Sequence, residues 1–414
     1  MARLARLKSA GGLTAALSLC LVANLAPLMA FPAVLPEVSK AWQLTASEAG
    51  WIGGSYFAGY ALAVPFLSSA TDRLDGRWVV AAASLMGAAA GLGFAAVANG
   101  FWPALVLRFA GGAALAGVHM PGLALLTDRT EGANQARSVS IYTSSYALGS
   151  SGSFLAAGVV DALFGWRAAF LVSALGPLLA VAAVVCLSRP PPRRCPARAR
   201  LISDFGFVLR DRTFMAYVLG FAGNTWEVFG IRVWFVACLA WTMGVPGNDI
   251  ALPNLAVIAG LSSLAGVPAS IVVAEIASRR SRPRTIIVTC AVSGAVCLAL
   301  AATAGGPIAL VLSLLILLQI TSFADVGALG AGAVSLADPS RRGTALAVYA
   351  LAGFTTGFLG PAASGLALDL SGGAASASGW TAAFLVMAIG SAAAGWAVSR
   401  AQGRRAEIRR HPAR

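Results

Sequence analysis

Two charged residues interrupt an otherwise apolar stretch of this chain. Glu227 and Arg232 are the only charged side chains between Thr213 and Trp241. In lipid, a charge near the bilayer centre costs at least ~2.5–3.5 kcal/mol, so such residues normally face a cavity or a partner. A carboxyl group in that position can take up and release a proton, and an arginine can bind an anion. Five residues place the two side chains about 140° apart around a helix, so they do not form a simple i,i+4 ion pair.

A few other polar residues lie within apolar stretches. Arg108 and His119 are eleven residues apart, so they share one helix face within about 20° and stand ~16 Å apart along it. Asn224 precedes Glu227 by three residues and shares its face. Each could instead have a structural role, as a histidine packed between helices or an arginine at a membrane boundary. The candidate substrate- and proton-binding residues are Arg108, His119, Asn224, Glu227, Arg232 and Asp325.

The amino-acid composition indicates whether this chain folds in water or in a lipid bilayer. Of its 414 residues 58% are hydrophobic and 11% charged, against about 25% charged in soluble domains. Stretches of roughly 20 apolar residues, long enough to cross ~30 Å of hydrocarbon, recur from end to end. The chain is therefore expected to be an all-α integral membrane protein. Its six cysteines show no metal-ligand spacing, so neither a metal nor a cofactor is expected.

Charge, proline and glycine clusters divide the chain into twelve expected transmembrane helices. They cover residues 11–35, 46–70, 78–98, 101–127, 137–160, 166–188, 212–241, 253–277, 285–304, 307–335, 342–368 and 379–399.

The basic residues predict the orientation of these helices. If loops alternate between the two sides, 26 of the 30 Lys and Arg residues fall on the side of both termini. The positive-inside rule makes that side cytoplasmic. The net charge of +14 is then a topology signal, and no nucleic-acid partner is expected. The first apolar run is longer than a signal-peptide core, so it is expected to stay as a helix.

An internal repeat divides the chain into halves. GWRAAFLVSALG (165–176) returns as GWTAAFLVMAIG (379–390), each copy opening the last helix of a group of six. A stretch rich in proline and arginine lies between the groups and is typical of a linker. The expected organisation is a six-helix bundle at 1–188, a cytoplasmic linker at 189–211, a second bundle at 212–400 and a basic cytoplasmic tail at 401–414.

Loop motifs accompany this repeat. TDRLDGRW after the second helix is similar to the motif G-x-x-x-D-R-x-G-R-R. Ser68 stands in place of its first glycine, and one extra residue precedes its second glycine, Gly76. Arg108 and Gly112 resemble an R-x-x-x-G motif. With twelve helices and a repeat, the chain resembles the major facilitator superfamily. The resemblance implies that Asp72, Arg73, Gly76 and Arg77 form a conformational latch. The alternative is that they belong to a solvated loop without such a role.

The resemblance also implies a function. In this superfamily helices 1, 4, 7 and 10 line a central cavity, and the intramembrane polar residues lie on those helices. We expect a monomeric secondary transporter in a bacterial inner membrane, with Glu227 and Asn224 facing that cavity. Arg108, Arg232 and His119 favour a small anionic solute, and Glu227 or Asp325 would carry a coupling proton. The alternatives are a drug/proton efflux antiporter, a non-transporting membrane sensor and an integral-membrane enzyme.

Overall fold

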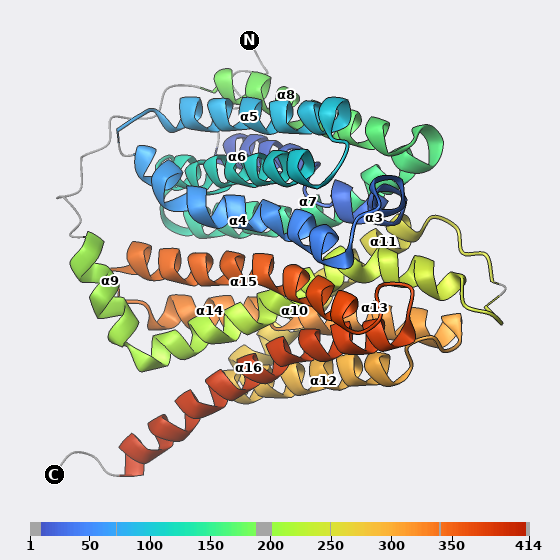
Figure 1. Ribbon diagram of the computed structural model, residues 1–414. Coiled ribbons are helices and arrows are strands. Elements are labelled where there is room, and N and C mark those ends of the chain that lie inside the picture. Colours follow the sequence, from blue (N-terminus) through green and yellow to red (C-terminus); the bar gives the residue numbers. More distant parts are fainter. Residues whose placement is uncertain (1–9, 72, 188–200, 249, 339–340, 411–414) are drawn as a thin grey trace. The chain divides into compact units, whose positions relative to one another are not determined.

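Every regular element in the described part of the chain is an α-helix. The computed structural model describes residues 10–71, 73–187, 201–248, 250–338 and 341–410, so the all-helical prediction is confirmed (Figure 1). The helices are α2 (Ala10–Leu25), α3 (Ala30–Trp42), α4 (Ala46–Ala70), α5 (Gly76–Val97), α6 (Phe101–Thr127), α7 (Gly132–Phe164), α8 (Trp166–Val185), α9 (Leu201–Arg210), α10 (Arg212–Met243), α11 (Leu255–Arg279), α12 (Arg282–Ala302), α13 (Ile308–Ala324), α14 (Val326–Leu336), α15 (Arg342–Leu370) and α16 (Ala377–Arg410).

Eleven helical segments of the described chain are long and apolar enough to cross a membrane, which makes this a multi-pass membrane protein. Two of the segments, Gly11–Trp42 and Ile308–Leu336, each join two consecutive helices. Helix α4, at the predicted second span, has 25 residues but is not among the eleven. Its first half contains Glu48 and several Gly and Ser residues, which lowers its mean hydropathy. By length and composition, the described residues thus contain eleven candidate spans, against twelve predicted.

Two helices that were expected to be continuous are broken. The first expected helix, 11–35, consists of α2 and α3, with a turn between Leu25 and Ala30 and a later end at Trp42. Pro27 lies in this turn, and proline cannot donate a backbone hydrogen bond. The helix expected at 307–335 is interrupted at Asp325, which ends α13 and precedes α14. Each break frees backbone carbonyls that need other donors.

Contacts divide the chain into two compact units. The first comprises Met1–Leu44, Ser55–Pro196 and Leu252–Leu264. Within it, α5 packs against α6 and α8, and α2 packs against α6, α7 and α8. The α4 and α6 backbones approach closely, because a Cβ at Gly112 would collide with the Tyr56 carbonyl oxygen and one at Gly59 with that of Phe109. Small residues in these helices therefore serve close packing.

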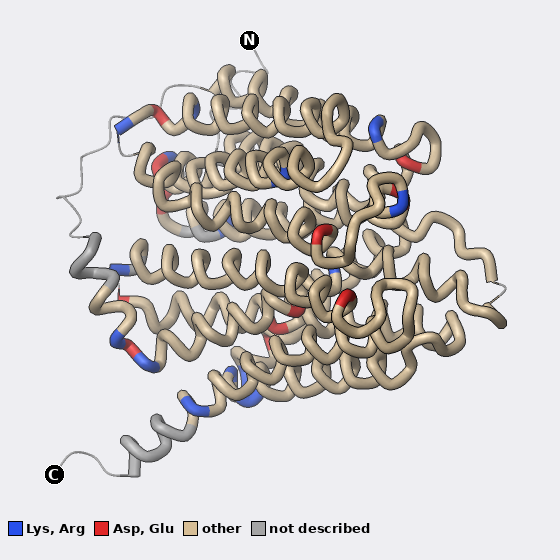
Figure 2. The backbone as a smooth tube through the Cα atoms, in the orientation of Figure 1, with Lys and Arg blue, Asp and Glu red and all other residues tan. Residues whose placement is uncertain are grey.

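The second unit comprises Thr45–Gly54, Ala197–Ala251 and Ala265–Arg414. Helix α10 packs against α13, α14, α15 and α16, and α12 packs against α13 and α16. The region predicted as a linker contains the helix α9, whose Val208 joins a core cluster with Phe214 and Leu329. Asp211 then caps α10, accepting from the amides of Thr213 and Phe214. Most charged residues lie towards helix ends, and few interrupt the helices (Figure 2).

Candidate functional site

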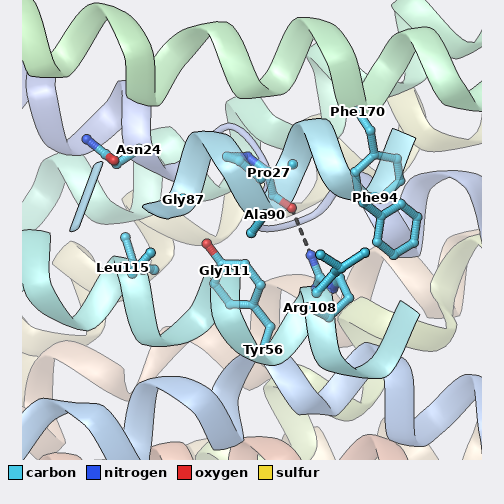
Figure 3. A pocket seen from close by; sticks show the side chains of 13 residues that line it. Asn24, Pro27, Tyr56, Gly87, Ala90, Phe94, Arg108, Gly111, Leu115 and Phe170 are labelled. Carbon is cyan, nitrogen blue, oxygen red and sulfur yellow. Dashed lines mark hydrogen bonds between the residues drawn. The ribbon is translucent and has the colours of Figure 1, made fainter. Parts of the chain in front are cut away.

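Arg108 on α6 binds the break between α2 and α3. Its side chain is 3% exposed, and its two terminal nitrogens donate to the carbonyls of Pro27 at 2.8 Å and Leu28 at 2.9 Å. The guanidinium carbon lies 4.5 Å from the centroid of the Tyr56 ring. Figure 3 shows Arg108 reaching towards Pro27 beside this ring. The arginine thus supplies the donors that the broken helix lacks.

A small cavity of about 20 Å³ lies beside this guanidinium, room for about one water molecule. Its walls are mainly small and apolar residues of α5 and α6, with Phe94 stacked on Phe170 at one side. Asn24 and Tyr56 are its other polar side chains, and none of the lining residues is acidic. The Nε of Arg108 has no hydrogen-bond partner. The cavity therefore holds a positive charge without a carboxylate beside it.

His119 lies further along α6 among three tyrosines. Its Nδ1 is 2.8 Å from the hydroxyl of Tyr60 on α4. Tyr142 on α7 donates its hydroxyl to the backbone carbonyl of His119 at 2.9 Å, and the ring of Tyr146 lies 5.1 Å away. Arg108 and His119 thus contact tyrosines one turn apart on α4, Tyr56 and Tyr60, as expected for residues that share a helix face.

In the second unit, Asn224 on α10 binds the other helix break. Its amide nitrogen donates to the Ser322 carbonyl at 2.6 Å and to Asp325 Oδ1 at 2.7 Å. The second carboxylate oxygen of Asp325 accepts from the thiol of Cys290 at 3.3 Å. Asn224 and Asp325 are 3% and 2% exposed. A polar side chain therefore supplies donors at the break in each unit.

Glu227 lies in the same pocket as Asn224 and Asp325. Its Oε1 accepts from the Ser293 hydroxyl at 2.8 Å and from the Cys297 thiol at 3.3 Å. Cys290, Ser293 and Cys297 are spaced i, i+3, i+7, so α12 presents all three donors on one face. The residues lining this narrow pocket belong to α10, α12, α13, α16 and the α13/α14 break, all within the second unit.

The pocket is acidic, and no Lys or Arg lines it. Arg232 is not among the lining residues; its guanidinium packs on the Phe323 ring at 5.1 Å from the centroid. This placement agrees with the 140° expected between Arg232 and Glu227. Two ionised carboxylates in one buried pocket repel each other and lack hydration. The arrangement favours at least one bound proton or other cation.

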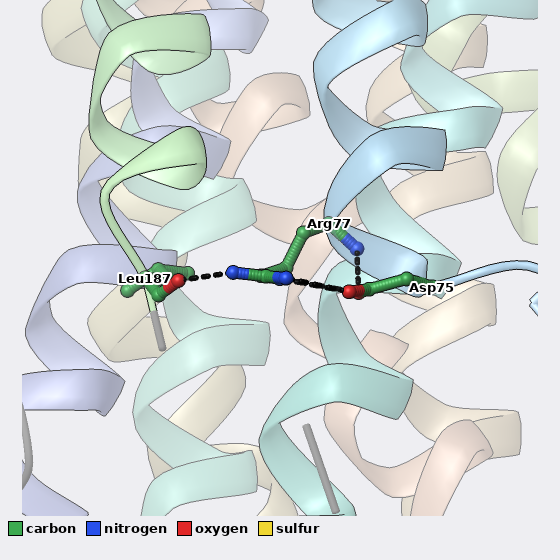
Figure 4. A network of polar contacts seen from close by, with 3 residues as sticks. All are labelled: Asp75, Arg77 and Leu187. Atoms are coloured by element: carbon green, nitrogen blue, oxygen red, sulfur yellow. Dashed lines mark hydrogen bonds and ion pairs between the residues drawn. The ribbon is translucent and has the colours of Figure 1, made fainter. Parts of the chain in front are cut away.

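Among the expected latch residues, Arg77 forms polar contacts within the first unit. Arg77 donates to both oxygens of Asp75, the shortest contact being 2.7 Å, and to the Leu187 carbonyl after α8 (Figure 4). Asp75 also caps α5, accepting from the Arg77 amide at 3.0 Å. Partial burial raises the pKa of Asp75, but the hydrogen bonds and charge of Arg77 outweigh burial and leave that pKa below its ordinary value.

The other latch residues differ in their surroundings. Asp72 lies outside the described residues. Arg73 is exposed, and Gly76 is buried where a Cβ would lie 3.0 Å from the Leu125 side chain. The carboxylate that binds Arg77 is therefore Asp75, which the motif comparison did not select.

Sequence reasoning also missed the donors on α12. The cysteines were considered only as metal ligands, whereas the thiols of Cys290 and Cys297 donate to the buried carboxylates. The i, i+3, i+7 spacing of the polar residues Cys290, Ser293 and Cys297 was the signal that could have identified this face.

Comparison with known proteins agrees with the fold. The family model of the Major Facilitator Superfamily matches residues 17–361. The structure is similar to a bacterial homolog of the human lysosomal transporter Spinster, in an inward-facing and occupied conformation, with a TM-score of 0.77, 16% identity and coverage of 94% of this chain and 96% of that one. The nucleoside transporter NupG gives a TM-score of 0.74 at 14% identity, covering 94% and 99% of the two chains. No curated protein matches the sequence.

Proposed function

This chain belongs to the Major Facilitator Superfamily and is a membrane transporter, and we propose that it moves a small organic anion in company with protons. The observation that carries this proposal is the pocket in which Glu227 and Asp325 are buried with no basic residue lining it. A carboxyl group so placed binds a proton when isolated from water and releases it when hydration or a cation reaches it. Alternating access supplies that change of surroundings.

The cavity at Arg108 supports an anionic solute. Its guanidinium is buried, no acidic residue lines the cavity, and one N–H group has no partner. Arginine recognises carboxylates and phosphates through paired hydrogen bonds. The small and apolar walls favour an anion with an apolar body. Arg232 and His119 are proposed as further contributors to recognition.

The broken helices support a site in each unit. Transporters commonly build substrate and ion sites at interrupted membrane helices, where free backbone groups and helix ends are available. Here the interruptions at Pro27 and Asp325 are bound by Arg108 and Asn224. We further propose a bacterial inner-membrane location, cytoplasmic termini, a monomeric state and a conformational role for the Asp72–Arg77 loop.

The first test identifies the solute and then removes the proton carrier. A thermal-shift screen of the purified protein against organic acids, inorganic anions, vitamins and drugs selects a substrate, with the uncharged amide or ester of each acid as its matched control. Uptake into proteoliposomes is then measured with and without an inward proton gradient. We expect Glu227→Gln to abolish the gradient-driven component while counterflow exchange of labelled for unlabelled solute continues.

The control variant is Glu275→Gln, because Glu275 is exposed and pairs with Arg279 on the same helix. It is expected to transport like the wild type. Full gradient-driven uptake by a folded Glu227→Gln protein would remove Glu227 from the mechanism. Absence of counterflow for every selected solute would favour a sensor over a carrier, and selection of cationic drugs alone would favour the efflux alternative.

A further inference from the structure

Three oxygen atoms in the acidic pocket of the second unit accept no hydrogen bond. They are Asn224 Oδ1, Ser322 Oγ and Ser391 Oγ, and all three residues line the pocket that contains Glu227 and Asp325. The Ser391 hydroxyl lies beside the Glu227 carboxylate and interacts with it, which leaves the lone pairs of its oxygen free. Each of these side chains is 2% or 3% exposed. The amide orientation of Asn224 follows from its neighbours, because its nitrogen faces a carbonyl and a carboxylate, which only accept. Its oxygen is therefore the atom left unpaired.

Such a set of oxygens is costly to bury unless something binds to it, because each gives up its hydrogen bonds to water without a donor in return. All three are oxygens with free lone pairs, and two carboxylates lie beside them. A ligand that satisfies five such oxygen-bearing groups accepts lone pairs and carries positive charge.

The position of the pocket also favours a cation. Helix α13 ends at Ala324, and the end of a helix carries a partial negative charge from its unpaired carbonyls. No Lys or Arg lines the pocket, and the space between its side chains is too narrow for a water molecule, so an ion bound there would be without its hydration shell. Interrupted membrane helices bind Na⁺ in this way in other transporters, through free carbonyls and helix C-terminal ends.

We propose that this pocket binds a dehydrated Na⁺ ion through the carboxylates of Glu227 and Asp325 and the oxygens of Asn224, Ser322 and Ser391. The all-oxygen set selects a hard cation. The two nearby thiols are engaged as donors to the carboxylates, and the described residues contain no group of three or more His, Cys, Asp or Glu suited to a metal ion. These features disfavour a soft transition metal.

Charge balance links this site to protons. Two carboxylates are neutralised either by two protons or by one Na⁺ and one proton, so the ions compete. The titratable groups that face the carboxylates are the thiols of Cys290 and Cys297 on α12 and the phenol of Tyr349 on α15. None of these supplies a positive charge. The inference shares its carboxylates with the proposed function but does not require that protons drive transport.

Binding of ²²Na⁺ to the purified full-length protein tests the site, measured by scintillation proximity without organic solute and with choline as the background cation. We expect saturable binding at pH 8.5 that weakens as the pH falls. Ser391→Ala should weaken binding about tenfold, a usual loss when one group that supports a metal site is removed. Asp325→Asn should abolish it. Ser364→Ala is the matched control, because Ser364 is fully buried and donates within α15 to the Gly360 carbonyl.

Absence of saturable binding by the folded wild type, or equal affinity in the Ser391→Ala and Ser364→Ala proteins, would overturn the proposal. Thermal unfolding without Na⁺ reports folding of each variant. Proton-driven uptake in Na⁺-free buffer separates this inference from the proposed function. Uptake that depends on Glu227, with no Na⁺ binding, retains the function and rejects the Na⁺ site. Na⁺ binding without proton-driven uptake retains the Na⁺ site and rejects proton coupling.

Discussion

Replacement of Arg108 tests whether this arginine holds the broken first helix together. Arg108→Ala removes two hydrogen bonds from a charged donor and leaves the Pro27 and Leu28 carbonyls unpaired. Hydrogen bonds to charged groups contribute about 1.5–3 kcal/mol each. The variant also relieves the cost of burying a cation, so the net loss in the free energy of unfolding should be about 3–5 kcal/mol. Arg108→Lys keeps the charge but cannot match the geometry of the guanidinium, and should lose roughly half as much.

The assay is equilibrium unfolding of purified protein in mixed detergent micelles, followed by tryptophan fluorescence. Arg280→Ala is the control, because Arg280 is exposed on the segment after α11 and should change the free energy by less than about 0.5 kcal/mol. If Arg108→Ala is as stable as Arg280→Ala, the hydrogen bonds to the helix break do not stabilise the fold. If Arg108→Lys matches the wild type, the paired geometry of the guanidinium is irrelevant.

Three further variants test the packing and polar contacts described above. Gly112→Ala should lower the free energy of unfolding by at least about 1–3 kcal/mol, because the new Cβ would collide with the Tyr56 carbonyl. Gly152→Ala is the control, because a Cβ there has nothing within 4 Å, and it should be neutral or gain up to about 1 kcal/mol. Equal unfolding midpoints for the two variants would contradict close helix packing. Asp75→Ala should lose about 0.5–2 kcal/mol at pH 7 as a helix cap. Because the folded pKa of Asp75 is lowered, its contribution is present above the ordinary value of about 3.9 and disappears as the pH falls through the folded pKa; a difference from wild type that persists at pH 2 would refute this origin. Tyr60→Phe should lose about 0.5–1.5 kcal/mol with its contact to His119, and unchanged unfolding would show that this contact is not stabilising.

The sequence predicted the helical class, and its span boundaries agree with most helices to within a few residues. Those features follow from composition and from apolar length, which are local properties. The break at Pro27 had a visible cause, but the break at Asp325 has no proline and depends on contacts from α10. Similarly, α9 shows little apolar length, and its Val208 is buried through packing in the second unit.

The candidate site was predicted in part. Polarity within apolar runs selected Arg108, Asn224, Glu227 and Asp325, and the structure places the last three in one pocket. Charge and strong polarity alone did not select α12 and α16, which complete this pocket, because serine and cysteine are common packing residues in membrane helices. The motif comparison selected Asp72, which lies outside the described residues. It did not select Asp75, whose contact with Arg77 depends on a helix cap, which is a three-dimensional feature.

Proton movement measured together with solute movement tests the central claim most directly. Proteoliposomes that contain a pH-sensitive dye are exposed to a gradient of the selected solute in Na⁺-free buffer. The wild type should change the internal pH in proportion to solute flux. The Glu227→Gln/Asp325→Asn double variant, which retains the size of both side chains, should exchange solute without any pH change. A pH change of wild-type size in the folded double variant would contradict the assignment of these two buried carboxylates as the proton carriers.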